Sequence, residues 1–259
     1  MPERDLALLT DAARAAGEIA LRHWKQTPQV WEKPGLGPAT EADLAVNDML
    51  VHALRKARPD YGWLSEETPD DTARLEAQNV FIIDPIDGTR AFIAGEDTFS
   101  HSLAVARGGQ IVAAVVYLPV LDRLYTATNL GPALRDGQPI AASTRPSSTG
   151  ATMLITQPAL QPDLWPGGIP PVKRAFRASL AYRLCLVAEG RHDGMATFRP
   201  TWEWDCAAGS LIAARAGAVV SDGQGLTAGF NRPSPQLPGL IAASPGLHAE
   251  LVARRHPLF

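Results

Sequence analysis

The chain has 259 residues, of which 46% are hydrophobic, and a formal net charge of −3. This is enough apolar material for a sizeable core in one large domain or two tightly joined halves. The negative charge argues against a nucleic-acid polymer as partner, because phosphate backbones are bound by basic faces. A small phosphorylated metabolite stays open, since bound metal ions can supply local positive charge.

The N-terminus and the hydropathy pattern bear on the location of the protein. The first five residues are largely charged and precede an amphipathic pattern, unlike a signal peptide. No apolar run approaches the ~20 residues of a membrane span. Cys185 and Cys206 each lie in an apolar, helix-like segment, which favours two buried free thiols in a reducing compartment over one disulfide. We therefore expect a cytoplasmic protein without a membrane partner.

The first half combines helices with a run of strands. Helical spacing of apolar residues predicts a helix over 5–24, and a Pro/Gly-rich loop is expected at 34–39. Thr40 is the expected N-cap of a second helix, which ends before Pro59, with Asp43 as its capping-box partner. Strands are then expected at Tyr61–Leu64, Val80–Asp84, Leu103–Ala106, Ile111–Leu118 and Arg123–Thr128, the last three as an antiparallel meander, with a hairpin turn at 135–138.

The second half alternates strands with helices. A polar stretch at 143–150 separates an α+β half (1–146) from an α/β half (147–259), which we expect to form one compact unit. The Pro-rich patches at 158–171 and 232–238 are expected to be surface loops. The expected strands are Thr152–Thr156, Gly194–Thr197, Ala218–Ser221 and Gly239–Ala243, and the expected helices are Leu180–Glu189, Asp205–Ala216 and 246–255.

The run Val80–Thr89 carries the most informative motif. Four apolar residues predict a buried strand, and Pro85 and Gly88 then turn the chain. The turn lets the carboxylates of Asp84 and Asp87 converge with the backbone carbonyl of Ile86. Hard oxygen ligands on a rigid strand end are what Mg²⁺ requires.

Further acidic residues have both structural and functional interpretations. Glu66 and Glu67 could be a solvated pair in an acidic loop, and Asp87-Gly88 alone could be a turn. Asp205 could be a helix N-cap, which is compatible with metal binding. An isolated carboxylate at the end of the apolar strand would be costly to bury, however. Asp84 therefore favours the metal site.

These motifs together resemble the inositol monophosphatase superfamily. The resemblance rests on Asp84-Pro85-Ile86-Asp87-Gly88-Thr89, on Glu66-Glu67 and on Trp204-Asp205-Cys206-Ala207-Ala208-Gly209. Members are Mg²⁺-dependent, lithium-sensitive phosphatases of small phosphate monoesters, including the 3′(2′),5′-bisphosphate nucleotidases. The resemblance implies a layered αβαβα sandwich and two or three Mg²⁺ ions. It leaves both a monomer and a homodimer open.

The resemblance also implies roles for individual residues. The first metal would be held by Glu66, Asp84 and the Ile86 carbonyl, and the second by Asp84, Asp87 and Asp205. Glu66 could also contact a third ion, and Lys33 matches a basic residue near the site. Thr89, hydrogen-bonded to Asp43, would orient and activate the attacking water. The backbone N–H groups at 88–89 would hold the phosphate. The residues implied to contact the substrate are Asp87, Gly88, Thr89, Ser179, Arg183 and Asp205.

The substrate itself is less clearly indicated. Inositol-preferring members place a Glu before the position of Asp205, whereas this chain reads Ala196-Thr197-Phe198-Arg199-Pro200-Thr201-Trp202 in that segment, and Glu203 is too close to substitute. Phe198, Tyr182 or Arg183 could suit a nucleotide, although the pattern favours core positions for the two aromatic residues. The segment 90–93 also favours the bisphosphate nucleotidase branch slightly. Inositol monophosphate, a sugar bisphosphate, histidinol phosphate and a non-catalytic metal- or phosphate-binding role stay open as alternatives.

Overall fold

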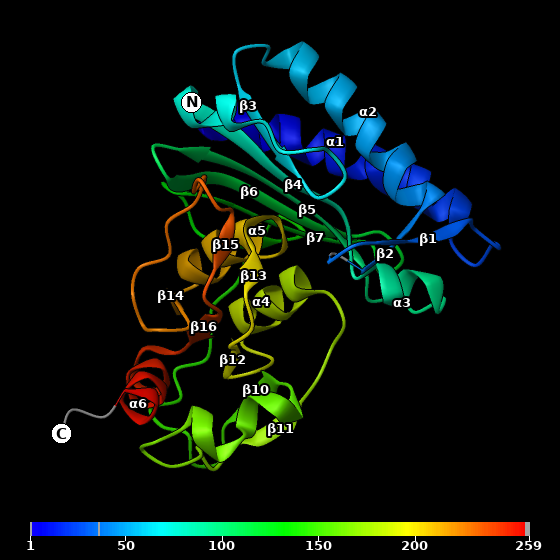
Figure 1. The fold of residues 1–259 in the computed structure, drawn as a ribbon. Coiled ribbons are helices and arrows are strands. Elements are labelled where there is room, and N and C mark those ends of the chain that lie inside the picture. The colour runs from blue at the N-terminus through cyan, green and yellow to red at the C-terminus, as the bar shows by residue number, and fades with distance from the viewer. Residues whose placement is uncertain (1, 36, 257–259) are drawn as a thin grey trace.

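The computed structural model describes residues 2–35 and 37–256, whose elements stack in five layers. Two helices cover the outer face of a seven-stranded sheet, and two more lie between that sheet and a five-stranded one (Figure 1). A last helix packs on the far side of the smaller sheet. This is the αβαβα sandwich of mixed α+β and α/β character expected from the sequence, so the predicted fold class is confirmed.

The larger sheet is antiparallel except for one parallel pair, β3 with β4. Its strands in spatial order are β3 (Gly62–Ser65), β4 (Asn79–Asp87), β5 (Ser100–Arg107), β6 (Gln110–Leu118), β7 (Arg123–Thr128), β8 (Leu134–Arg135) and β9 (Gln138–Pro139). The expected meander is present as β5, β6 and β7, and the expected hairpin turn joins β8 to β9. Strand β4 continues to Asp87 instead of ending at Asp84, which places both carboxylates on the strand itself.

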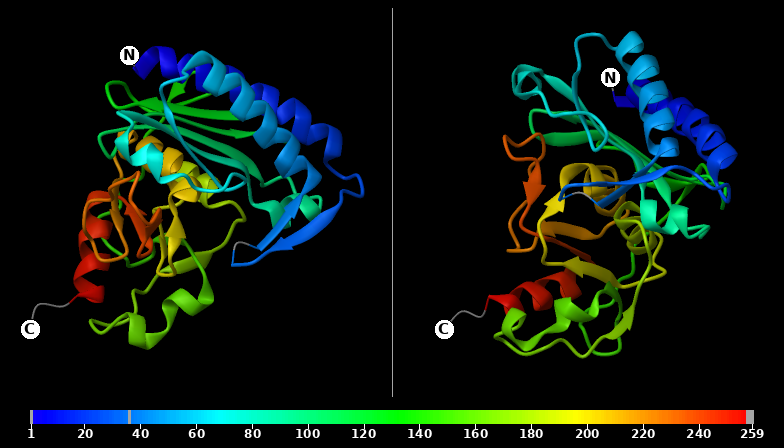
Figure 2. Two further views of the ribbon diagram at one scale, coloured as in Figure 1. Left: turned by 45° about the horizontal axis from the view of Figure 1, so that its top comes forward. Right: turned by 45° about the vertical axis from the view of Figure 1, so that its right-hand side comes forward.

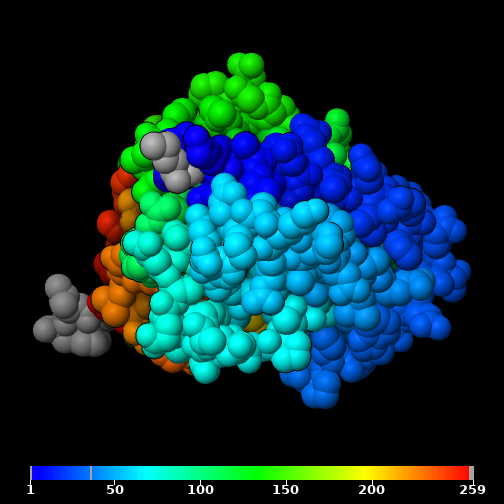
Figure 3. Space-filling model, turned by 90° about the horizontal axis from the view of Figure 1, so that it is seen from above, coloured from blue at the N-terminus to red at the C-terminus, as the bar shows by residue number. Residues whose placement is uncertain are grey.

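Helices α1 (Pro2–His23) and α2 (Glu41–Ala57) cover the outer face of the larger sheet, as Figure 3 shows from above. The predicted capping box at the start of α2 is present. Thr40 Oγ1 accepts a hydrogen bond from Ala42 N at 3.2 Å, and Asp43 Oδ2 accepts one from Thr40 N at 2.8 Å. The cap fixes the carboxylate of Asp43 at the first turn of the helix.

The segment before α2 differs from the loop expected at 34–39. Val30–Lys33 (β1) and Gly37–Thr40 (β2) form an antiparallel hairpin in which Lys33 pairs with Gly37, while residue 36 lies outside the described residues. The glycines and prolines predicted irregular backbone, but the strand partner immediately upstream satisfies these backbone groups. The hairpin also carries Lys33 to the acidic residues after β3.

Helices α4 (Leu180–Ala188) and α5 (Glu203–Arg215) fill the layer between the two sheets. Cys185 on α4 and Cys206 on α5 are buried free thiols, as predicted. Helix α5 begins at Glu203, with Trp202 as N-cap, so the interpretation of Asp205 as an N-cap is wrong. A short strand leads directly into the helix and moves its start upstream, which leaves Asp205 in the first turn, where a carboxylate is still favourable.

The smaller sheet combines parallel and antiparallel pairs. Its strands in spatial order are β11 (Lys173–Ala175), β10 (Thr152–Ile155), β12 (Gly194–Thr197), β16 (Leu240–Ala243) and β14 (Val219–Asp222). Strands β13 (Thr201–Trp202) and β15 (Gln236–Leu237) form a separate pair, so 232–238 is not wholly loop. Helix α6 (Pro245–Arg255) covers the outer face of the smaller sheet, at the opposite end of the molecule from α1 (Figure 2).

The Pro-rich patch at 158–171 is in part buried, contrary to the expected surface loop. It includes two 3₁₀ helices, η2 (Gln157–Leu160) and η3 (Pro162–Leu164). Trp165, only 2% exposed, packs beneath them and donates from Nε1 to Ala159 O at 2.8 Å. Prolines can begin 3₁₀ turns, which explains how this stretch packs without longer elements.

Two short elements complete the fold, namely η1 (Thr72–Glu76) and α3 (Thr89–Ile93). The strands of the larger sheet precede residue 146 in the chain and those of the smaller sheet follow it, and the division into two halves of one compact unit stays a prediction. Across the part of the chain that the structure describes, no helix has both the length and the apolar character to cross a membrane.

Candidate active site

Strand β4 ends in a bulge and a tight turn that carry the two motif carboxylates. The pairing of β4 with β5 shifts register between Asp84 and Asp87, which inserts one extra residue on β4. Gly88 follows with φ of 99°, a left-handed conformation in which a side chain would be strained, and α3 begins at the next residue. The bulge and the turn place Asp84, Asp87 and Thr89 in the wall of one cavity.

Three carboxylates from separate elements converge beside this turn. Glu66 follows β3, Asp84 lies on β4 and Asp205 lies on α5, and one oxygen of each lies within 4.8 Å of the others. Asp84 Oδ1 is buried and has no hydrogen-bond partner among the described residues. A buried carboxylate oxygen without a donor is costly, and clustered carboxylate oxygens are ligands that Mg²⁺ prefers. The cluster therefore fits a divalent cation.

The electrostatics of the cluster indicate the same need for positive charge. Burial raises the pKa of Asp84 and of Asp205 well above the ordinary value, and the neighbouring carboxylates raise both further. Burial also raises the pKa of Glu66 to about 7, although Lys33 opposes this shift. Lys33 Nζ lies 2.8 Å from Glu66 Oε1 and also contacts Glu67. The sequence therefore placed Lys33 near the site correctly.

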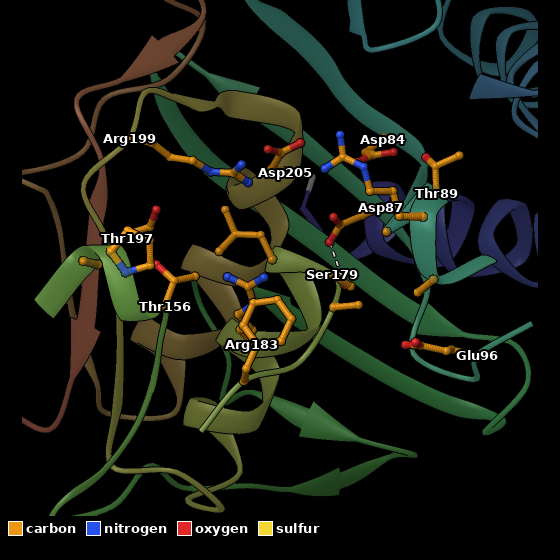
Figure 4. Close-up of a pocket in the computed structure, with 18 of the residues that line it drawn as sticks. Asp84, Asp87, Thr89, Glu96, Thr156, Ser179, Arg183, Thr197, Arg199 and Asp205 are labelled. Carbon is orange, nitrogen blue, oxygen red and sulfur yellow. Dashed lines mark hydrogen bonds between the residues drawn. The ribbon is translucent and has the colours of Figure 1, made fainter. Parts of the chain in front are cut away.

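Asp87 lines the same cavity, but its carboxylate is directed toward α4 (Figure 4). Its Oδ2 accepts hydrogen bonds from Ser179 Oγ at 2.6 Å and from Ala181 N at 2.7 Å. Ser179 is the N-cap of α4, and its Oγ accepts from Tyr182 N at 2.9 Å. Asp87 thus anchors the start of α4, a contact that sequence reasoning missed because it joins residues more than ninety positions apart.

Thr89 and Asp43 meet as the sequence predicted. Thr89 Oγ1 lies 3.3 Å from Asp43 Oδ1 and 3.1 Å from the carbonyl oxygen of Ile86, and both side chains are buried. Burial raises the pKa of Asp43 to about 6, while its hydrogen bonds from Thr40 lower it. The expected phosphate contact of the backbone at Gly88 and Thr89 stays a prediction.

The convergent residues form one wall of a cavity of about 910 Å³. Figure 4 shows Asp84, Asp87 and Thr89 on one side, with Arg183 and Arg199 across the opening from them. The remaining lining on the far side includes hydroxyl and aromatic groups from Thr156, Phe176, Thr197 and Phe198. A mostly acidic wall, to which Arg90 on α3 also contributes, thus faces a basic and aromatic one.

The basic wall is only partly the one expected. Arg183 donates from Nε to Arg177 O and stacks over the ring of Phe176 at 4.5 Å. Arg199, which is exposed, was not singled out, although it follows directly after Phe198. The available signal was that Arg199 lies in the segment that lacks the glutamate of inositol-preferring members.

The aromatic residues left open by the sequence divide into two cases. Tyr182 is buried in the core between the sheets, which confirms the structural interpretation. Phe198 lines the cavity and packs edge-on against Trp165, with the Arg255 guanidinium 3.8 Å from its ring centre. Glu203 is fully buried and accepts hydrogen bonds from backbone N–H groups at 231 and 232, so it cannot act on a substrate.

A protein-family model described as the inositol monophosphatase family matches residues 1–257. The chain belongs to this family. The predicted resemblance is therefore confirmed, and family membership supports a phosphoric monoester hydrolase. Three of the motif carboxylates, Glu66, Asp84 and Asp205, form the acidic cluster that could bind metal, whereas Asp87 lies outside it.

Individual relatives within the inositol monophosphatase family carry different names. An inositol-1-monophosphatase of Mesorhizobium japonicum is 32% identical over 235 residues, which cover 85% of this chain and 86% of the relative. The 3′(2′),5′-bisphosphate nucleotidase CysQ of Escherichia coli K12 is 32% identical over 221 residues, which cover 82% and 88%. The structure of the extragenic suppressor protein suhB of Bartonella henselae matches with a TM-score of 0.84 at 27% identity, covering 99% of this chain and 100% of that one. Overall similarity therefore does not select a substrate.

Proposed function

We propose that this protein is a Mg²⁺-dependent phosphatase that hydrolyses a small phosphate monoester. The observation that carries the proposal is the convergence of Glu66, Asp84 and Asp205 at the wall of a cavity, with Asp84 Oδ1 buried and lacking any described partner. A purely structural cluster would pair such an oxygen with a donor.

The cluster of Glu66, Asp84 and Asp205 fits a divalent cation, and the family resemblance implies two such ions. Glu66, Asp84 and the Ile86 carbonyl would hold the first, and Asp84, Asp87 and Asp205 would hold the second; Glu66 could contact a third. When bound, such ions lower the pKa of a water molecule, neutralise the phosphate and stabilise the leaving oxygen.

Thr89 is arranged to orient a water molecule. Its hydroxyl has one proton, which it can donate either to Asp43 Oδ1 or to the Ile86 carbonyl. With that carbonyl held as a metal ligand, the Thr89 proton would be donated to Asp43. The hydroxyl oxygen would then accept a hydrogen bond from water and orient it for attack, with the water proton passing to Thr89 Oγ1 as the Thr89 hydroxyl proton passes to Asp43 Oδ1. This pair favours a catalytic role over passive phosphate binding.

The far wall favours a substrate that carries a second anionic group. Arg183 and Arg199 line the same far wall of the cavity. Burial lowers the pKa of Arg183 and the charge of Arg199 lowers it further, while Asp87 and Asp205 raise it, so an anion beside the two arginines would stabilise their positive charges. Phe198 offers an apolar surface beside them where inositol-preferring members carry a carboxylate. We therefore favour a 3′(2′),5′-bisphosphate nucleotide over an inositol monophosphate.

Arg199→Gln tests this preference. The substitution is expected to lower kcat/KM for a bisphosphate nucleotide by about 10- to 100-fold, because a charge-assisted hydrogen bond contributes about 1.5–3 kcal/mol. Arg199 is exposed, so the fold should be retained. For inositol 1-phosphate, which lacks the second anion, the change should stay within about threefold. Arg22→Gln, on the exposed face of α1, is the matched control; an equal loss for both substrates would contradict the assignment.

A substrate panel tests the function as a whole. We expect phosphate release that requires Mg²⁺, stops with EDTA and is inhibited by Li⁺, with kcat/KM highest for 3′-phosphoadenosine 5′-phosphate. The other substrates are myo-inositol 1-phosphate, a sugar bisphosphate and histidinol phosphate. A preference above about tenfold for the inositol phosphate would overturn the substrate assignment. Tight Mg²⁺ or phosphate binding without release from any monoester would favour a non-catalytic binding protein. Cytoplasmic location and homodimer formation stay predictions.

A further inference from the structure

Strand β5 places a histidine in an otherwise apolar layer. His101 is fully buried, and both Leu103, on the same face of the strand, and Phe99, just before the strand, belong to the cluster beneath α1 and α2. The rings of Phe99 and Tyr117 lie 6.3 and 6.4 Å from the imidazole. A buried imidazole costs free energy unless hydrogen bonds compensate, so packing alone would favour an aliphatic side chain at this position.

The hydrogen bond of this histidine is directed at the turn that carries the carboxylates. His101 Nδ1 lies 2.5 Å from the carbonyl oxygen of Pro85. A carbonyl oxygen only accepts, so Nδ1 carries the proton and Nε2 does not. Nε2 has no partner among the described residues, which leaves Pro85 as the single polar contact of the ring within that part of the chain.

Pro85 lies at the bulge between the two motif carboxylates. Asp84 pairs with Ser102 and Asp87 with Ser100, so His101 lies opposite the extra residue. Backbone pairing is interrupted at a bulge, and a proline has no N–H to donate. The imidazole therefore donates to the Pro85 carbonyl at a point where backbone pairing between β4 and β5 is interrupted. It thereby fixes the peptide that joins Pro85 to Ile86, and with it the start of the segment whose Ile86 carbonyl contacts Thr89.

We infer that His101 is a positioning residue for the metal-binding turn, which it holds through the Pro85 carbonyl so that Asp84, Asp87 and the Ile86 carbonyl face the cation sites. The inference rests on the proposed function to the extent that the turn binds Mg²⁺. His101 itself contacts neither metal nor substrate; its effect passes through the backbone of the bulge.

His101→Leu and His101→Asn separate positioning from packing. Leucine fills the apolar layer but donates nothing, whereas the asparagine amide can place a donor near the position of Nδ1. On the full-length protein, calorimetric titration with Mg²⁺ alone should show about 10- to 100-fold weaker binding for His101→Leu, as for other groups that orient metal ligands. His101→Asn should stay within about threefold of the unmodified protein. The same order is expected in kcat at saturating Mg²⁺, with KM little changed.

Thermal melting in EDTA and a neighbouring variant provide the controls. His101→Leu should melt no lower than the unmodified protein in EDTA, because an apolar side chain replaces a partly satisfied polar one. Leu103→Val, on the same strand and face, removes packing without removing a hydrogen bond and should keep full Mg²⁺ affinity. If His101→Leu does not fold, His101→Gln can replace it. The glutamine amide would lie near the position of Nε2 and not of Nδ1, so it cannot donate to Pro85, and this variant should show the same loss of Mg²⁺ affinity.

The outcomes distinguish this inference from the proposed function. Unchanged Mg²⁺ affinity in His101→Leu, or equal losses in His101→Leu and His101→Asn, would overturn the inference alone. A comparable loss in Leu103→Val would assign the effect to packing and would also overturn it. An unmodified protein that binds no Mg²⁺ in the calorimeter would overturn the proposed function together with the inference.

Discussion

Asp84→Asn is expected to lower kcat on the order of 10³-fold and to stabilise the protein in the absence of metal. A metal site contributes several kcal/mol of transition-state stabilisation, which corresponds to about that factor in rate. Asp84 lies at the centre of the acidic cluster and is expected to contact two ions. Its charge is nonetheless unfavourable without them, because burial and the surrounding carboxylates all raise its pKa. Asparagine keeps the shape and removes the charge.

The stability of the metal-free protein should also depend on pH, through two other carboxylates near Asp84. In the folded, metal-free protein the pKa of Glu66 is raised from 4.5 to about 7 and that of Asp43 from 3.8 to about 6, mainly by burial. The folded state therefore holds more protons than the unfolded chain between about pH 4 and 7. Stability is highest at the acid end of this window and falls as the pH rises through it. Saturating Mg²⁺ should remove most of this decline, since it binds the ionised form.

Thermal melts with EDTA and with Mg²⁺ across this pH range, together with kcat, check the prediction. At pH 7 in EDTA, Asp84→Asn should melt a few degrees higher, at about 2–4 °C for each kcal/mol gained. Its melting temperature should no longer rise with Mg²⁺. Asp5→Asn is the matched control: Asp5 is also fully buried but is paired with Arg58 Nε at 3.0 Å, so its neutralisation should destabilise. A variant with unchanged kcat or unchanged stabilisation by Mg²⁺ would refute the role of Asp84.

The acidic wall of the cavity was predictable because its signals are local. An apolar run ending in Asp84, a proline, Asp87 and a glycine describes a buried strand that turns; the structure has the turn at Gly88, and the strand reaches it through a bulge that was not predicted. The capping box likewise located Asp43 at the first turn of its helix. Local patterns determine where such side chains lie on their own elements. The family resemblance then indicated that these elements meet.

The basic wall could not be derived in the same way. Arg199 lies in a short connection between two strands, where no periodicity indicates the direction of a side chain. The hairpin at β1 and β2 was missed because glycine and proline predict turns, whereas pairing with the adjacent strand overrides that preference. The start of α5 at Glu203 depends on the pairing of β13 with β15, a contact between segments far apart in the chain. The positions of Arg199 and of the α5 start therefore depend on contacts that only the assembled fold provides.

Asp87→Asn is the second substitution with a large expected effect, and the structure adds a competing explanation for it. The carboxylate both lies in the wall of the proposed metal site and anchors the start of α4 through Ser179 Oγ and Ala181 N. Loss of the charge at a second metal ligand should lower kcat by about 10²- to 10³-fold. The amide oxygen of asparagine can still accept from Ala181 N, so α4 should keep its place and the fold should be retained.

Comparison with Ser179→Ala separates the two roles of Asp87. This variant removes one hydrogen bond from the Asp87 carboxylate and the cap of α4 but leaves the charge, so it should destabilise the protein by about 1 kcal/mol and lower kcat by no more than about tenfold. If Asp87 acted only as an anchor, the order would reverse, with Asp87→Asn nearly silent and Ser179→Ala the more damaging. Titration of kcat with Mg²⁺ decides between them, because a lost ligand also raises the Mg²⁺ concentration required. Full turnover of Asp87→Asn at saturating Mg²⁺ would remove Asp87 from the metal site and leave the carboxylates of Glu66, Asp84 and Asp205 as the cation-binding set.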